Sequence, residues 1–123
     1  MKINYAIIFV SDMTRSVAFY RDVLGFSLKF ESTHWAEFAT GGATLALHLS
    51  DEPISQGPGE EPPGHCRPGF QVPNLDIFHQ RMVENNVPCN QKPKAVFGAR
   101  MAQYVDPDGL IFSVGESRHD DEG

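Results

Sequence analysis

The sequence predicts an α+β fold made of two βαβββ modules that form a curved mixed sheet around a cleft. Strand-like apolar runs alternate with two segments whose apolar residues recur at helical spacing. A connector rich in proline and glycine divides the chain, and the order of segments before it is repeated after it. The 123 residues are 41% hydrophobic and 21% charged, which is enough apolar material for a single globular domain.

A strand and a helix open the first module, which is expected over about residues 3–50. Residues 5–10 are almost all apolar or aromatic and predict a strand. Asp12 can cap the helix that follows, and Gly25 can take the left-handed position that ends it. Between them, spacings of four, three and four residues separate Met13, Val17, Tyr20 and Leu24.

Three β-prone segments complete the first module, over residues 26–32, 35–40 and 43–49. The pair Gly41 and Gly42 separates the last two segments and is typical of a hairpin turn. The module therefore has the predicted order βαβββ.

The second module is expected over about residues 67–116, between a connector at residues 51–66 and a polar tail at residues 117–123. Residues 69–72 are strand-like, and Asn74 can cap a second helix. The apolar face and the left-handed end of that helix are marked by Leu75, Phe78, Met82 and Asn86.

The two modules align with each other along the sequence. Residues 10–13 lie over residues 72–75 at an offset of 62, and residues 42–46 lie over residues 109–113 at an offset of 67. The duplication predicts that each module's sheet buries one face under its own helix. If the two sheets curve toward each other, their remaining faces enclose a cleft.

Strand alternation assigns side chains to the core or to the cleft. The core side of the fourth and last strands receives Leu45, Leu47, Leu49, Leu110, Phe112 and Val114. The cleft side receives Tyr5, Phe9, Thr44, Ala46, His48, Arg67, Gln71 and Ser113. Trp35 and Glu37 join the cleft if Phe38 packs on the helix. Arg100 either clamps an anionic substrate group or pairs with a surface carboxylate.

Three motifs resemble a known family. Residues 10–13 read Val-Ser-Asp-Met, residues 19–26 read Phe-Tyr-Arg-Asp-Val-Leu-Gly-Phe, and residues 106–109 read Asp-Pro-Asp-Gly. Over about residues 3–116 the chain resembles the vicinal oxygen chelate superfamily, which includes glyoxalase I, bleomycin-resistance proteins, fosfomycin-resistance enzymes and extradiol dioxygenases. The resemblance implies paired βαβββ modules, frequently a homodimer, and a cleft that binds a small molecule.

The resemblance also indicates where metal ligands stand in metal-using relatives. The corresponding positions here are Tyr5, Ala46, Arg67 and Ser113. None of them is a usual metal ligand, and Arg67 places a permanent positive charge where the ion would sit. We therefore expect no metal and no other cofactor. A relocated metal site made by His48, His65 and Glu37 is the alternative.

Two functional hypotheses follow for the cleft. The first is a metal-independent, bleomycin-resistance-like protein that binds a small molecule between aromatic walls. The second is a lyase or isomerase of glyoxalase type, with the relocated metal or with Tyr5 and His48 as catalytic residues and His48 as the general base. Candidate ligand-binding residues are Phe9, Trp35, Glu37, Thr44, Arg67, Gln71, Arg100 and Ser113. A regulatory subunit with a vestigial cleft is a third hypothesis, which the small residues of the cleft side disfavour.

Composition and charge exclude other classes of function. The net charge of −6 disfavours nucleic acid, whose phosphates are bound by Lys and Arg. No apolar run approaches the roughly 20 residues of a membrane span, and no signal-peptide pattern opens the chain. We therefore expect a cytoplasmic protein without a membrane partner, whose partners are a small-molecule ligand and a second copy of the chain.

Overall fold

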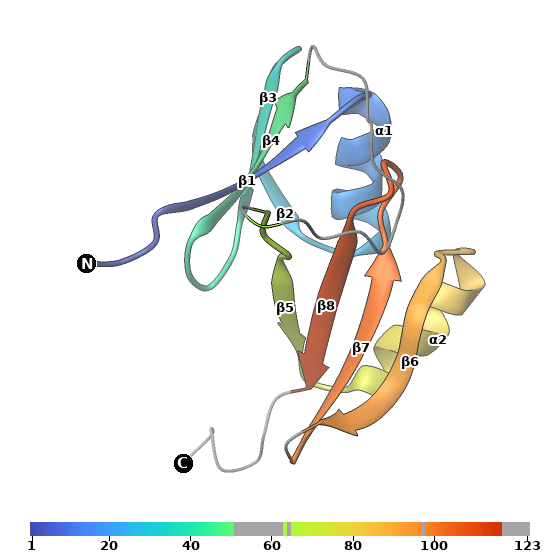
Figure 1. Cartoon of the computed structure of the whole chain (residues 1–123). Coiled ribbons are helices and arrows are strands. Elements are labelled where there is room, and N and C mark those ends of the chain that lie inside the picture. Colours follow the sequence, from blue (N-terminus) through green and yellow to red (C-terminus); the bar gives the residue numbers. More distant parts are fainter. Residues whose placement is uncertain (51–62, 64, 97, 117–123) are drawn as a thin grey trace. The chain divides into compact units, whose positions relative to one another are not determined.

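The computed structural model describes residues 1–50, 63, 65–96 and 98–116 (Figure 1). The chain forms two compact units, Met1–Ser55 and Gln56–Gly123, and each is described by itself. Each unit contains one four-stranded sheet. Within the described residues, no helix has the length and apolar character needed to cross a membrane.

The first unit has the predicted βαβββ order. It contains β1 (Tyr5–Val10), α1 (Met13–Ala18), the π-helical turn η1 (Phe19–Val23), β2 (Ser27–Glu31), β3 (Trp35–Ala39) and β4 (Thr44–Leu49). The strands pair in the order β1-β4-β3-β2, with β1 parallel to β4 and the other neighbours antiparallel. Figure 1 shows α1 against one face of this sheet.

The predicted helix over residues 13–24 is divided into α1 and η1. Asp12 caps α1 as predicted, because its side chain accepts a hydrogen bond from the backbone N–H of Arg15 at 3.0 Å. The wider turn of η1 contains two consecutive aromatic residues, Phe19 and Tyr20, and both are buried. Gly25 has a φ of 91°, which confirms the left-handed end of the helical segment.

The second unit repeats the architecture of the first. It contains β5 (Gly69–Val72), α2 (Leu75–Glu84), β6 (Cys89–Val96), β7 (Ala99–Val105) and β8 (Ile111–Glu116). The sheet order is β5-β8-β7-β6, and β5 is parallel to β8 just as β1 is to β4. The predicted duplication is therefore confirmed.

Both predicted ends of α2 are confirmed, and a third contact holds its first turn. The side chain of Asn74 accepts a hydrogen bond from the N–H of Ile77 at 3.0 Å, and Asn86 has a left-handed φ of 56°. The carboxylate of Glu116 accepts a hydrogen bond from the N–H of Leu75 at 2.9 Å. This bond joins the end of β8 to the start of α2.

Each unit has an aromatic and aliphatic core between its helix and its sheet. In the first unit the rings of Tyr20 and Phe38 lie 6.2 Å apart, and both side chains are fully buried. In the second unit the rings of Tyr104 and Phe112 lie 5.9 Å apart, also without exposure. Burial contributes roughly 1.5–3 kcal/mol for each large apolar side chain, so these cores dominate stability.

Ser16 offers a test of the packing of α1. Its side chain is fully buried, and its hydroxyl has no hydrogen-bond partner within the described residues. We expect Ser16→Ala to raise the free energy of unfolding by about 1 kcal/mol, because it removes an unsatisfied polar group and improves helix propensity. Urea denaturation measures the change, with the exposed Ser27→Ala as the control. A loss of stability in Ser16→Ala would contradict the described packing.

Candidate functional site

The face of the first sheet opposite α1 carries exposed apolar side chains. On β1, Ile8 and Val10 are buried. Tyr5, Ile7 and Phe9 retain exposed fractions of 52%, 47% and 63%. The alternation predicted for this strand is therefore confirmed.

The neighbouring strands extend this face. The buried residues of β3 and β4 on the helix side are Ala36, Phe38, Leu45 and Leu47. Trp35 and Glu37 are half-buried on the other side, together with the exposed His48. We call Tyr5, Phe9, Trp35, Glu37 and His48 the aromatic face.

Small or partly covered residues separate the members of the aromatic face. Ala46 pairs with Ile7 on one side and with Glu37 on the other, and it is fully buried rather than open. Thr44 pairs with Tyr5 and is half-buried. Strand alternation therefore places both residues on the side opposite α1, as predicted. Of the two, only Thr44 retains exposed surface.

Trp35 is held in its orientation within the aromatic face by three of the other members of this face. Its indole Nε1–H donates a hydrogen bond to the Glu37 carboxylate at 2.8 Å. Its ring meets the ring of His48 edge-on at 5.9 Å, and the ring of Tyr5 at 6.4 Å with an interplanar angle of 64°. A ring restrained in this way loses little conformational entropy when a ligand stacks on it.

His48 presents one defined nitrogen to the aromatic face. Its Nδ1 lies 2.8 Å from the backbone carbonyl oxygen of Leu49. Because a carbonyl oxygen only accepts hydrogen bonds, Nδ1 carries the proton, and the neutral ring has its lone pair on Nε2. The ring also packs against Phe9 at 5.2 Å. The imidazole can therefore accept a proton or a hydrogen bond at Nε2.

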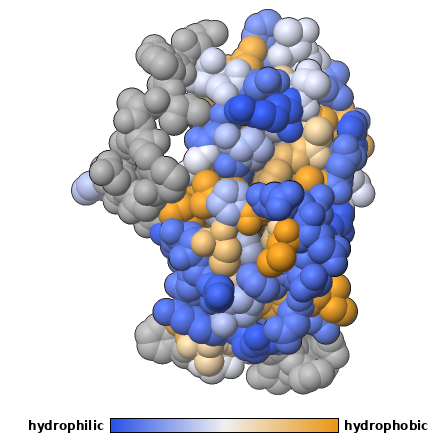
Figure 2. Space-filling model, turned by 90° about the vertical axis from the view of Figure 1, so that its right-hand side faces the viewer, coloured by the Kyte–Doolittle hydropathy of each residue, from blue (hydrophilic) through white to orange (hydrophobic). Residues whose placement is uncertain are grey.

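The exposed rings of the aromatic face are grouped together, whereas exposed apolar residues elsewhere are scattered (Figure 2). Figure 2 shows a face on which hydrophobic residues form small separate patches among hydrophilic ones. On α2, Ile77 and Val83 are exposed large apolar residues that lie more than one helical turn apart. Single exposed apolar residues are ordinary, whereas a contiguous group indicates a binding surface.

Besides Arg100, the second unit contains three predicted site residues. Arg67 precedes β5 and is exposed, and Gln71 is an exposed residue of β5. Ser113 pairs with Gly69 in the centre of the sheet, but only 9% of its surface is exposed. The sequence places Ser113 on the cleft side without indicating this burial.

Arg100 forms an ion pair within the second unit. It lies on the same side of β7 as the buried Ala102 and Tyr104, and its guanidinium donates two hydrogen bonds to Asp76, at 3.0 and 2.9 Å. Glu116 lies 3.8 Å away. Of the two roles stated for Arg100, pairing with a surface carboxylate is the one observed. The hydrogen bonds lower the pKa of Asp76, so the pair's stabilising contribution is lost as the pH falls through that lowered value.

The match to a family of known proteins extends over nearly the whole chain. The model of the Glyoxalase/Bleomycin resistance protein/Dioxygenase superfamily matches residues 2–114. The chain belongs to this superfamily. Its two βαβββ units agree with that assignment.

Several relatives of this superfamily member are similar over most of their length. The uncharacterised protein YraH of Bacillus subtilis is 30% identical over 125 residues, which cover 93% of this chain and 97% of YraH. The metallothiol transferase FosB of Staphylococcus saprophyticus is 27% identical, over 91% of this chain and 74% of FosB. A glyoxalase/dioxygenase structure from Nostoc punctiforme has a TM-score of 0.84 at 21% identity, and covers 96% of this chain and 92% of its own.

Four residues of this superfamily member stand where metal-using relatives are expected to have metal ligands, and none of the four is a usual ligand of a divalent ion. At the four positions that the resemblance assigns to ligands, Ala46 offers a buried methyl group, Arg67 a cation, and Tyr5 and Ser113 weak neutral donors. Among the described residues, no group of three His, Cys, Asp or Glu side chains could hold a metal. His48 and Glu37 of the relocated set lie in the first unit and His65 in the second.

Proposed function

We propose that this chain binds a flat organic molecule on the aromatic face, without a metal ion. The observation that carries the proposal is the restrained indole of Trp35, held by Glu37 and flanked by His48 and Tyr5. A ligand ring stacked in this position gains apolar burial and aromatic contacts together. The superfamily name includes bleomycin-resistance proteins, and a binding role of that kind needs no catalytic metal.

His48 and Glu37 add polarity to a largely apolar surface. Nε2 of His48 is placed to accept a hydrogen bond from a hydroxyl or N–H of the ligand. A few such groups among aromatic side chains are typical of small-molecule sites, where they fix the orientation of the ligand. Phe9 supplies a further wall beside His48.

The second unit has an open surface on its own sheet. Gly69 and Gly115 lie on the sheet face opposite α2, and a Cβ added at either position would meet no atom within 4 Å. We propose that Arg67, Gln71 and Ser113 contact a ligand on this face of the second unit. In the first unit, Thr44 beside Tyr5 is assigned to ligand contact as part of the aromatic-face proposal.

A neutral aromatic probe with a hydroxyl group tests the proposed site. We expect 2-naphthol to bind several-fold more weakly to His48→Phe than to the unchanged protein, because phenylalanine keeps the ring and removes Nε2. Binding of 2-methoxynaphthalene, which has no donor, should be the same for both proteins. Isothermal titration calorimetry measures both ligands. If neither naphthalene binds, the proposed function fails.

The fixed tautomer of His48 favours a second candidate function. With Nδ1 bonded to a carbonyl, Nε2 can act as a general base in a lyase or isomerase reaction, with Tyr5 on the same sheet face. In this alternative His48→Phe abolishes turnover as well as weakening binding. A substrate whose conversion survives that change would contradict it.

Metal content distinguishes this proposal from the metal chemistry of the superfamily. We expect protein purified without chelators to contain far less than one Ni, Zn, Fe or Mn ion per chain, because Tyr5, Ala46, Arg67 and Ser113 replace the ligand set. We also expect no metal-stimulated isomerisation of the hemithioacetal of methylglyoxal and glutathione. Elemental analysis of the purified protein measures the metal content per chain. Stoichiometric metal that disappears in His48→Ala would contradict this expectation.

We further propose that two copies of the chain assemble into a homodimer. Symmetric dimers are the commonest oligomers of soluble proteins, and the superfamily resemblance favours one here. Multi-angle light scattering should give about twice the chain mass of 13.7 kDa. A monomeric mass at tens of micromolar would contradict the assembly.

A further inference from the structure

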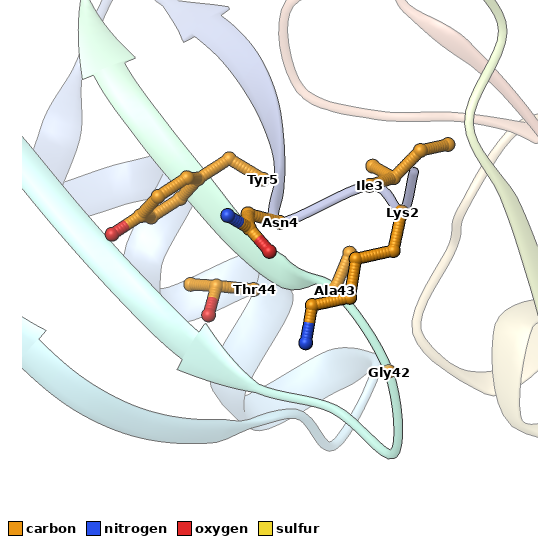
Figure 3. A pocket seen from close by; sticks show the side chains of 7 residues that line it. All are labelled: Lys2, Ile3, Asn4, Tyr5, Gly42, Ala43 and Thr44. Carbon is orange, nitrogen blue, oxygen red and sulfur yellow. The ribbon is translucent and has the colours of Figure 1, made fainter.

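A pocket lies at one end of the aromatic face, where β1 begins and the turn between β3 and β4 closes (Figure 3). Its volume is about 540 Å³, which is within the range of small-molecule sites. It is lined by Lys2, Ile3, Asn4, Tyr5, Gly42, Ala43 and Thr44. The backbone N–H of Thr44 donates to the carbonyl of Asn4 at 2.8 Å, which holds the two walls together.

The polar groups of this pocket suit an anion. Lys2 contributes an ammonium group, Asn4 an amide and Thr44 a hydroxyl, and none of the lining residues within the described part of the chain is Asp or Glu. Within the described residues, these three side chains make no hydrogen bond or ion pair. In Figure 3 the Lys2 side chain runs past Ala43, and the side chains of Asn4 and Thr44 are seen on one side of it. Each of the three groups can donate a hydrogen bond to a carboxylate.

Tyr5 connects the pocket to the aromatic face. It lines the pocket, pairs with Thr44 across the strands, and lies 6.4 Å from the ring of Trp35. A ligand whose ring stacks on Trp35 and Tyr5 can therefore extend a substituent along β1 into the pocket.

We propose that the ligand of this site is an aromatic carboxylate, whose anionic group is held by Lys2, Asn4 and Thr44. This inference rests on the proposed binding at the aromatic face and names the class of ligand. The net charge of −6 does not prevent it, since charges beyond about 8 Å are largely screened at physiological ionic strength. Glu37, the acidic member of the aromatic face, is already hydrogen-bonded to Trp35.

A pair of nearly isosteric probes separates the carboxylate from the ring. We expect 2-naphthoate to bind about tenfold more tightly than 2-naphthamide, as one charge-assisted contact allows. The side-chain N–H of Trp35, the single tryptophan, gives a unique signal in a ¹H–¹⁵N spectrum, and its shift measures both affinities. The preference should fall to about twofold or less in Lys2→Gln. Lys29→Gln, which changes the same charge on the exposed surface of β2, should retain it.

The outcomes distinguish this inference from the proposal on which it rests. If both probes shift the Trp35 signal with equal affinity, the aromatic face binds ligands, but the inference that Lys2, Asn4 and Thr44 hold a carboxylate is wrong. If the preference for naphthoate persists in Lys2→Gln, the carboxylate is held elsewhere and the inference is also overturned. If neither probe moves the Trp35 signal, both the inference and the proposed function fail.

Discussion

Replacing Leu47 by alanine is expected to lower the free energy of unfolding by about 2–5 kcal/mol, the range for large-to-small changes in a core. Leu47 is fully buried on the helix side of β4, between Ile8 of β1 and Ala36 of β3. The change removes three carbon atoms from the centre of the sheet, where the strands on both sides limit collapse of the cavity. Urea denaturation followed by circular dichroism measures the loss.

The next residue along β4 is the matched control. His48 points to the other face and is exposed, so His48→Ala should change stability by less than about 1 kcal/mol. Binding of an aromatic probe should weaken in His48→Ala. If His48→Ala unfolds the protein and Leu47→Ala has no effect, the face assignment of β4 is reversed, since a shift of one residue exchanges the two faces.

Asp106→Ala should lower stability by about 2–4 kcal/mol through loss of a turn rather than loss of packing. Its carboxylate accepts hydrogen bonds from the N–H groups of Asp108 and Leu110, both at 2.9 Å, and only 4% of the residue is exposed. Alanine leaves two backbone donors without that acceptor, and bonds to a charged group are the stronger kind. Thermal and urea denaturation measure the effect.

Asp106→Asn is the control for this turn, because its side-chain oxygen can still accept from the same two N–H groups. We expect it to retain more than half of the stability that Asp106→Ala loses. Equal losses in both variants would show that the charge, and not the geometry of the turn, stabilises the connection between β7 and β8.

The fold could be predicted from the sequence because its signals are local. Capping at Asp12 and Asn74, and the left-handed residues Gly25 and Asn86, depend on groups within a few residues. The π-helical turn at residues 19–23 could not be predicted in this way. An apolar spacing of three or four residues is compatible with both kinds of turn.

The candidate site was only partly predictable, for a different reason. Alternation assigned Tyr5, Trp35 and His48 to one face, but a period of two says nothing about neighbours on that face. The bond between Trp35 and Glu37 and the fixed tautomer of His48 depend on side-chain rotamers. The sequence does not indicate the pocket at Lys2 and Asn4. This pocket forms only because β1 pairs in parallel with β4, which brings the start of β1 beside the turn before β4.

The role of Arg100 could not be inferred from its position near the Asp-Pro-Asp-Gly motif. Its position shortly before Asp106 suggests that it binds a ligand. However, Arg100 alternates in step with Ala102 and Tyr104 along β7, and these two buried residues face the helix. The partner, Asp76, is 24 residues away in the sequence. A contact of that range follows from the packing of α2 on its sheet and not from a local pattern.

The central claim, binding at the aromatic face without metal, is tested most directly by the indole N–H of Trp35. The measurement is a titration of ¹⁵N-labelled, chelator-treated protein with 2-naphthol, with EDTA present throughout. We predict a saturable shift of the Trp35 signal whose affinity is unchanged by EDTA. A shift that requires added Zn, Ni or Mn, or a Trp35 signal that does not move while 2-naphthol binds elsewhere, would contradict the claim.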